Sequence, residues 1–427
     1  MERDFMRDLR LCLLLSLLLP PLTGCRGEEA PSGHAAQAPA PSASQPFPAS
    51  FPGRDPNLRW DASGNLHLVY VEDRPGGPAV LYRRLGADAA GPFTVSPAGM
   101  AVVADTESPP TLEILPDGAL VTGYPVALPG KWKSEIRVQR SADHGRTWSE
   151  PRLLHPRRDG SYSFLSSTVT PAGTVAFAWL DNRAGHMGVY AASTRDGQVF
   201  SPNQTVDAET CQCCGTALLA GRGGEIWLAY RDLEPGNLRD FRVLRSPADP
   251  LELGDGVKLS EDGWRVNGCP ETGARLAQAP DGTLWAAWFT AGGEAGVYAT
   301  SSPDAGASFA PRALVSETGR PARHPEIGVL PDGRIAVLYE TVASDGSHPI
   351  VIRIRDRQGG WSAPRTVTDG GSYPRFAGDS TRTALAFTRR SGERTSVEVI
   401  ELTPPPPAPG ASAPGPSRGE REGPRRS

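Results

Sequence analysis

The sequence has little lysine relative to arginine, no basic tract between its ends and hardly any helical periodicity. Its 44 Lys and Arg residues are outnumbered by 48 Asp and Glu residues, so the formal net charge is −4. Because a nucleic-acid surface needs clustered positive charge, this composition argues against a nucleic-acid partner. The missing 3.6-residue apolar repeat argues against a helical fold. Abundant glycine and proline between short apolar runs indicate an all-β protein instead.

A turn followed by a strand repeats along the chain at intervals of about 50 to 60 residues, the length of a propeller blade. Each copy places a glycine turn between two short apolar runs, which predicts a hairpin of buried strands. The copies lie at residues 63–70, 117–121, 172–177, 223–227, 281–285 and 332–337. A third and a fourth strand follow each hairpin, so the repeat predicts a four-stranded antiparallel blade.

A seventh, incomplete copy begins at Tyr373 and supplies three strands that end near Ile400. Its missing outer strand can come from the N-terminal side, at residues 46–51, which would close the ring. The sequence therefore predicts an all-β fold, a seven-bladed β-propeller, with a six-bladed propeller as the alternative.

Residues 141–148 (SADHGRTW) form a motif suited to a β-hairpin turn that begins at Ser141. The carboxylate of Asp143 can accept main-chain N–H bonds, Gly145 can take a positive φ, and the Trp148 ring can insert between sheets. This octapeptide resembles the Asp box, or BNR repeat, of the sialidase-like proteins, whose sialidases have six blades. Weaker copies lie at residues 193–197, 302–309 and 356–361. The boxes would cap the blades on the face opposite the starts of the innermost strands.

The N-terminus carries an apolar run at residues 11–22 that is too short to span a membrane and ends at small residues. We therefore expect an export signal over residues 1–24. The sequence Leu-Thr-Gly-Cys that ends at Cys25 resembles the bacterial lipobox, and the resemblance implies cleavage before Cys25 and acylation of its thiol, with palmitate or a similar chain. It places the protein in the bacterial cell envelope as a lipoprotein, on the outer membrane or the periplasmic face.

The two ends of the chain have compositions that cannot pack a core. Residues 25–52 are rich in Ala, Pro and Ser and predict an extended tether between the lipid and the propeller. Residues 403–427 predict a disordered tail. The propeller would occupy residues 53–402, and we expect it to be monomeric.

Four cysteines remain once Cys12 has left with the signal and Cys25 is acylated. They are Cys211, Cys213, Cys214 and Cys269. In an exported protein they are most simply interpreted as disulfides, such as Cys213 or Cys214 to Cys269. The alternative is a soft-metal site in which the thiolates, with His324, bind copper or zinc. A redox thiol is the third interpretation, and nothing else in the sequence calls for a cofactor.

The pairing of Cys-x-Cys-Cys with the Gly-Cys-Pro at residues 268–270 is similar to a group of bacterial sialidase-family envelope proteins. The sequences at residues 229–232 (AYRD), 238–240 (LRD) and 373–375 (YPR) match the same group. The resemblance covers most of the propeller, and its motifs do not indicate a reaction.

Sialidase chemistry needs three arginines for the substrate carboxylate, a tyrosine nucleophile with a glutamate base, and an acidic proton donor. The Arg54-Asp55-Pro56 sequence resembles the motif that carries the first arginine, with Asp55 replacing an aliphatic residue. The further candidates are Arg231, Arg375, Tyr373, Glu271 and either Asp73 or Asp240. Because Tyr373 and Arg375 lie two residues apart on one strand, they do not form a complete catalytic set.

Polar residues at the starts of the innermost strands and the ends of the second strands should gather on one face of the propeller. They include Asp55, Asp181, Arg183, Asp232, Arg239 and Glu326. This predicts a polar funnel for a glycan, a peptide or an envelope protein, and a network of structural ion pairs would produce the same pattern. The favoured hypothesis is an envelope lipoprotein with a Cys-containing binding face. The alternatives are an exo-α-sialidase-type glycoside hydrolase and a metal or redox protein.

Overall fold

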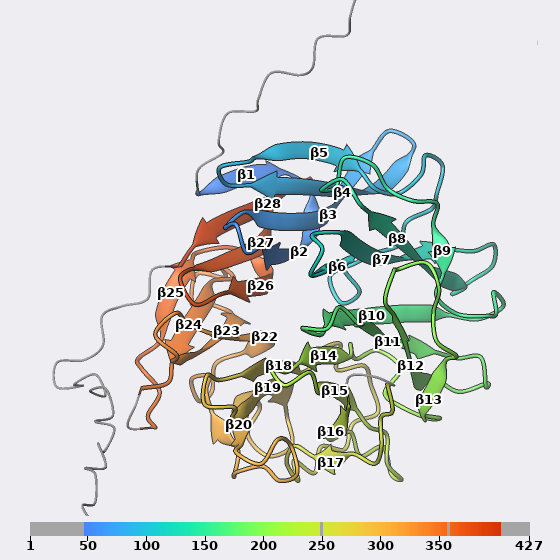
Figure 1. Ribbon diagram of the computed structural model, residues 1–427. Coiled ribbons are helices and arrows are strands. Elements are labelled where there is room, and N and C mark those ends of the chain that lie inside the picture. The colour runs from blue at the N-terminus through green and yellow to red at the C-terminus, as the bar shows by residue number, and fades with distance from the viewer. Residues whose placement is uncertain (1–46, 248–250, 357–358, 403–427) are drawn as a thin grey trace, which may run out of the picture. The chain divides into compact units, whose positions relative to one another are not determined.

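The computed structural model describes residues 47–247, 251–356 and 359–402, and within them 28 strands form seven four-stranded antiparallel sheets. The sheets stand as blades around a central axis (Figure 1). The predicted all-β class and the seven blades are confirmed, and the six-bladed alternative is wrong. The expected signal peptide, Cys25 and the C-terminal tail lie outside the described residues. Among the described residues, no helix is long and apolar enough to cross a membrane.

Six blades are built from four consecutive strands each, with the first strand innermost. Blade 1 contains β2 (Arg54–Trp60), β3 (Leu66–Arg74), β4 (Gly77–Leu85) and β5 (Ala90–Thr94). Blade 2 contains β6 (Thr111–Ile114), β7 (Leu120–Ala127), β8 (Ser134–Ser141) and β9 (Arg152–Leu153). Blade 3 contains β10 (Tyr162–Val169), β11 (Val175–Asp181), β12 (Gly188–Thr194) and β13 (Gln204–Asp207). Blade 4 contains β14 (Ala217–Ala220), β15 (Ile226–Arg231), β16 (Phe241–Ser246) and β17 (Val257–Lys258). Blade 5 contains β18 (Arg275–Gln278), β19 (Leu284–Thr290), β20 (Gly296–Ser302) and β21 (Ala313–Leu314). Blade 6 contains β22 (Ala322–Val329), β23 (Ile335–Thr341), β24 (Ile350–Ile354) and β25 (Arg365–Thr368).

Blade 7 closes the ring with a strand from the other end of the chain. It contains β26 (Ser372–Gly378), β27 (Thr383–Ser391), β28 (Arg394–Glu401) and, as its outer strand, β1 (Ala49–Pro52). This confirms the closure expected from residues 46–51. The Phe51 ring is buried, lies 4.9 Å from the Tyr70 ring of blade 1 and receives the Arg83 guanidinium on its face. The closing strand therefore also joins blade 7 to blade 1.

The Asp box at residues 141–148 adopts the predicted turn. The Asp143 carboxylate accepts the Thr147 N–H at 2.9 Å, and the Ser141 hydroxyl accepts the Gly145 N–H at 2.8 Å. Gly145 has a φ of +84°, which favours glycine. The Trp148 ring meets the Tyr82 ring of blade 1 edge to face at 5.8 Å. The box therefore fastens blade 2 to its neighbour.

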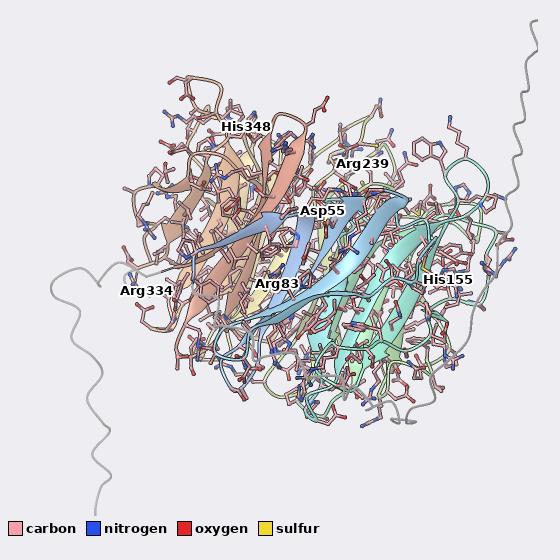
Figure 2. All side chains as sticks on the ribbon, turned by 90° about the horizontal axis from the view of Figure 1, so that it is seen from above. Asp55, Arg83, His155, Arg239, Arg334 and His348 are labelled. Atoms are coloured by element: carbon pink, nitrogen blue, oxygen red, sulfur yellow. The ribbon has the colours of Figure 1, made fainter. Side chains whose placement is uncertain are left out.

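The propeller has two unlike faces because neighbouring strands run antiparallel. We call the face on which the innermost strands start the strand-start face, and the opposite one, which carries the Asp box and the glycine turns after the innermost strands, the turn face. In the side view of Figure 2, Asp55 and Arg239 lie toward the strand-start face and Arg334 toward the turn face.

Four innermost strands carry the same irregularity where they begin. The pairing with the second strand shifts between Arg54 and Asn57, and at the matching place in blades 3, 6 and 7. The shifted segments contain Asp55, Phe164, His324 and Tyr373, all with φ between 47° and 55°. Backbone strain of this kind, in residues other than glycine, concentrates at functional sites. Candidate residues at these positions were predicted from the sequence, but the bulges were not.

Candidate functional site

The centre of the propeller holds a pocket of about 930 Å³ with walls from the innermost strands of all seven blades. Its volume is within the range of ligand-binding pockets. At the turn face the pocket reaches Arg222, Gly378 and Ser380, which are exposed. At the other end it is lined by Glu107, Glu326 and Arg375, whose side chains are no more than 14% exposed. The pocket therefore opens on the turn face.

The loop between blades 1 and 2 closes the pocket at the strand-start end. Arg54 donates to the carbonyl of Ala104 at 2.9 Å, and Arg375 donates to the carbonyl of Thr106 at 3.1 Å. The Ser108 hydroxyl accepts the Phe164 N–H at 2.9 Å. Residues 104–108 thus contact blades 1, 3 and 7. They fill this end of the channel, so the pocket does not open into the polar funnel expected on the strand-start face.

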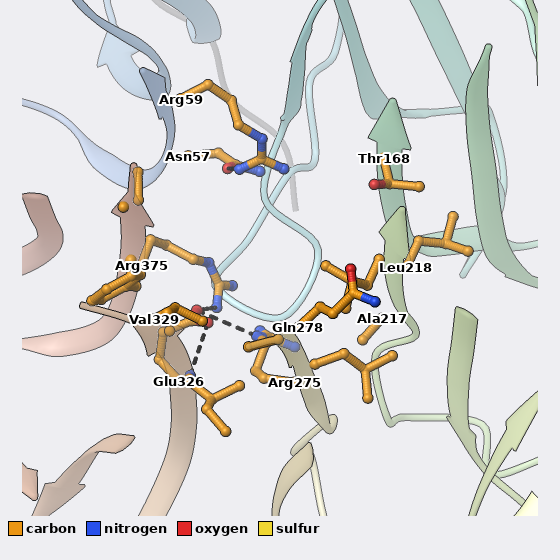
Figure 3. A pocket seen from close by; sticks show the side chains of 18 of the residues that line it. Asn57, Arg59, Thr168, Ala217, Leu218, Arg275, Gln278, Glu326, Val329 and Arg375 are labelled. Atoms are coloured by element: carbon orange, nitrogen blue, oxygen red, sulfur yellow. Dashed lines mark hydrogen bonds and ion pairs between the residues drawn. The ribbon is translucent and has the colours of Figure 1, made fainter. Parts of the chain in front are cut away.

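A carboxylate between two arginines forms the closed end of the pocket (Figure 3). An oxygen of Glu326 lies 3.5 Å from Nε of Arg275 and 3.8 Å from Nη1 of Arg375. Burial raises the pKa of Glu326, and the two guanidinium groups oppose that rise. Burial, followed by repulsion from Arg275, lowers the pKa of Arg375 to about 10. The positively charged guanidinium groups of Arg275 and Arg375 are therefore held close together at the buried end of the pocket.

Glu107 and Arg59 are also charged residues of the pocket lining. Burial raises the pKa of Glu107, whose carboxylate lies 3.5 Å from Nε2 of His324. Arg59 forms an ion pair with Glu113 at 3.0 Å, and Ser167 donates to the same carboxylate at 2.7 Å. Arg59, Arg275 and Arg375 thus bring three guanidinium groups to one pocket, from blades 1, 5 and 7, and the exposed Arg222 adds a fourth.

The residues chosen for sialidase chemistry do not converge. Arg54 binds Asp55 and Asp73 on the rim, and burial raises the pKa of Asp55 to about 6. Arg231 is buried and donates to the carbonyls of Arg239 and Phe289, at 2.9 and 2.8 Å. Only Arg375 of the three arginines lines the pocket.

The proposed nucleophile and its acid–base partners are likewise apart. The Tyr373 ring stacks on His324 with ring centroids 4.0 Å apart. The backbone N–H of Tyr373 donates to the Glu340 carboxylate at 2.5 Å. Glu271 is exposed. Asp240 is buried and accepts the N–H groups of Gly263 and Trp264, at 3.1 and 3.2 Å. Neither Tyr373, Glu271 nor Asp240 lines the pocket.

The remaining rim residues form local ion pairs. Asp181 is fully buried and accepts from Trp179 at 3.1 Å and from Arg183 at 2.6 Å. Asp232 accepts from Nε of Arg242 at 2.5 Å. These pairs fix the ends of second strands, which is the structural interpretation that the sequence left open. Among the predicted binding residues, only Glu326 lines the pocket.

The four cysteines are all free thiols, so the described residues contain no disulfide and Cys269 is not joined to the cluster. Cys269 is exposed, whereas Cys211, Cys213 and Cys214 are buried together. The Sγ atom of Cys211 lies 3.1 Å from that of Cys214 and 3.9 Å from that of Cys213. His324 is not in this group, because its ring lies between Glu340, Glu107 and Tyr373. The three thiols alone could hold a metal ion.

Arg59, Glu107 and Arg275 line the pocket but were not among the site residues predicted from the sequence. Arg275 begins β18 in blade 5, as Arg375 lies near the start of β26 in blade 7, so the register that identified Arg375 also applied to Arg275. Glu107 gives no such signal, since it lies in a loop outside the repeat.

The blades, the Asp-box turn and the strand closure together define a seven-bladed β-propeller. The sequence matches no protein-family profile, and no curated protein is similar to it at a significant level.

Solved structures share the fold at low sequence identity. A polysaccharide lyase of family PL25, an ulvan lyase bound to -[GlcA(1-4)Rha3S]-, is 12% identical with a TM-score of 0.57, over 83% of this chain and 94% of that one. A protein of unknown function from Dyadobacter fermentans is 16% identical with a TM-score of 0.50, over 71% of this chain and 98% of that one. The Hadza microbial sialidase Hz136 is 14% identical with a TM-score of 0.48, over 79% of this chain and 73% of that one.

Proposed function

We propose that this protein is a lipid-anchored binding protein of the bacterial cell envelope whose axial pocket takes an acidic saccharide from the turn face. The observation that carries the proposal is the set of guanidinium groups from Arg59, Arg275 and Arg375 in one pocket. Guanidinium groups bind carboxylates and sulfates through paired, charge-assisted hydrogen bonds. The saccharide in the ulvan lyase structure contains a uronic acid and a sulfated rhamnose, and it illustrates the chemical class expected here.

Glu326 gives the pocket a way to exchange one anion for another. Its carboxylate holds Arg275 and Arg375 in place when no ligand is bound, at N–O distances of 3.5 and 3.8 Å. These distances are longer than those of strong charge-assisted hydrogen bonds, which are about 2.7 to 2.9 Å. A ligand carboxylate or sulfate that approached more closely would compete favourably for both guanidinium groups.

We favour binding over sialoside hydrolysis because Tyr373 and Glu271 do not line the pocket. The arginines Arg54 and Arg231 are also occupied elsewhere, by a rim ion pair and by backbone carbonyls. A fluorogenic sialoside should therefore remain uncleaved. Cleavage that is lost in the Tyr373→Phe variant would favour the hydrolase instead.

Calorimetric titration with uronic-acid and sulfated oligosaccharides, against neutral ones, tests the binding proposal. We expect the acidic sugars alone to bind, with an affinity that falls as salt is added. The Arg275→Gln variant should lose at least tenfold in affinity, which is about 1.4 kcal/mol. The control is Arg320→Gln, which removes an arginine that is 57% exposed and lies outside the pocket lining. Equal affinity for neutral and acidic sugars, or an unchanged Arg275→Gln variant, would contradict the proposal.

The lipid anchor is tested separately. Labelling with radioactive palmitate in the bacterial host should mark the protein, and the Cys25→Ser variant should lose both the label and the membrane association. Labelling that survived this substitution would exclude Cys25 as the acylated residue.

A further inference from the structure

Three buried thiols and two arginines form a compact cluster near the strand-start face, apart from the axial pocket. The segment that carries Cys211, Cys213 and Cys214 precedes β14 of blade 4, and none of the three lines the pocket. Their Sγ atoms all lie within 4.8 Å of one another. Cys211 is 0%, Cys214 1% and Cys213 8% exposed, so Cys213 provides the path to solvent.

One guanidinium group contacts these thiols, and a second lies beside it. Arg239 is buried and its Nη1 atom donates to Sγ of Cys211 at 3.2 Å. Arg231 is buried beside it, with its guanidinium 4.0 Å from the centre of the Phe241 ring. Among the ion pairs of the described residues, neither arginine is paired with an acidic group. An arginine buried without a counter-charge is costly, so the site calls for negative charge.

The thiolates are the groups that can supply that charge. Their Sγ atoms lie together, and that of Cys211 already accepts from the Arg239 guanidinium. Three thiolates carry a charge of −3, and a monovalent cation among them leaves −2. The two guanidinium groups balance that charge fully, whereas a divalent ion would leave one of them unbalanced.

We propose that Cys211, Cys213 and Cys214 bind one cuprous ion, with Arg239 and Arg231 as its counter-charges. Thiolates are soft ligands that select Cu(I) and zinc. Zinc sites in proteins are almost always tetrahedral with four ligands, and the described residues bring only three metal-binding groups together here. The ligand number and the charge balance both favour the monovalent ion. Loading is Cu⁺ with three thiols, which yields the tris-thiolate complex and releases the protons to the buffer, with no change of oxidation state.

The geometry is close to that of a three-coordinate site. Three sulfurs around a metal at about 2.3 Å, the length of a zinc–thiolate bond, lie about 4 Å from one another. The distance of 3.9 Å between Cys211 and Cys213 already fits this arrangement. The distance of 3.1 Å between Cys211 and Cys214 must widen by about 0.9 Å to fit the same arrangement. A change of that size needs only a side-chain rotation.

The test uses the full chain, reduced without oxygen and titrated with Cu(I) against a chromogenic Cu(I) chelator. We expect one Cu(I) per chain and protection of Cys211, Cys213 and Cys214 from alkylation, with Cys269 left reactive. The Cys211→Ser variant should lose the tight site, and the matched Cys269→Ser variant should keep it. Arg239→Gln should weaken Cu(I) binding by at least tenfold while its thermal unfolding shows that the chain is still folded.

Three results would overturn the proposal. One is Cu(I) binding that survives the loss of Cys211. Another is tighter binding of Zn(II) than of Cu(I) in the same competition. The last is an intact mass of the native protein, isolated without reductant, that shows the cluster thiols joined in disulfides. Because saccharide binding depends on Arg275, failure at the thiol cluster and failure at the axial pocket would be recognised separately.

Discussion

Replacing Gly145 by alanine tests how the Asp box joins two blades. A Cβ atom at this position would lie 2.0 Å from Cε1 of Tyr82, in the neighbouring blade. The Tyr82 ring cannot move aside, because it is fully buried and its hydroxyl bonds Nδ1 of His67 at 2.8 Å. Overpacking of this kind costs about 1 to 3 kcal/mol. The positive φ of +84° adds about 1 to 2 kcal/mol for an alanine. We therefore expect Gly145→Ala to lower the free energy of unfolding by about 2 to 5 kcal/mol.

The control is Gly346→Ala, which carries nearly the same backbone change without the steric conflict. Gly346 has a φ of +82°, and an added Cβ would meet no atom within 4 Å. Gly346→Ala should lower the free energy of unfolding by the backbone conformational contribution alone, about 1 to 2 kcal/mol. Urea unfolding of the two variants beside the wild type measures the difference. Equal destabilisation of both variants would show that the contact between the box and blade 1 contributes nothing, and would refute the reasoning.

Two further predictions concern ring closure and buried charge. Phe51→Ala should lower the free energy of unfolding by about 3 to 5 kcal/mol, because its buried ring joins blade 7 to blade 1. Val199→Ala, at a side chain that is 73% exposed, should leave stability within about 0.5 kcal/mol in the same urea titration. Burial raises the pKa of Asp55 from 3.8 to about 6, so the folded chain keeps a proton there that the unfolded chain releases. The wild type should therefore gain about 2 kcal/mol over Asp55→Asn as the pH falls from about 7 to about 4. A stability difference that does not change with pH in that window would contradict the assignment.

The architecture was predictable because each blade carries its own local signals. The glycine turns and the motif at residues 141–148 specify hairpins through backbone conformation and side-chain bonds that involve only near neighbours. The closing strand β1 (Ala49–Pro52) was predictable from counting, since the last repeat lacks one strand. Because a propeller repeats one unit, a wrong strand prediction in one blade would not have changed the prediction of the other blades.

The site was only partly predictable because it depends on contacts between blades. The register of the innermost strands singled out Arg375 and Glu326, which both line the pocket. It could not show that residues 104–108 cross the strand-start end, because their contacts join segments far apart in the sequence. It also could not distinguish a free arginine from one already held by carbonyls, as Arg231 is.

The central claim is that the guanidinium groups of the axial pocket hold an acidic saccharide in place of Glu326. Its most direct test is calorimetric titration of one acidic oligosaccharide into Arg275→Gln and Glu326→Gln side by side. We expect opposite shifts: a loss of affinity for Arg275→Gln, and a gain of several-fold or more for Glu326→Gln, since the amide no longer competes for both arginines. Weaker binding in both variants, or no effect in either, would contradict it.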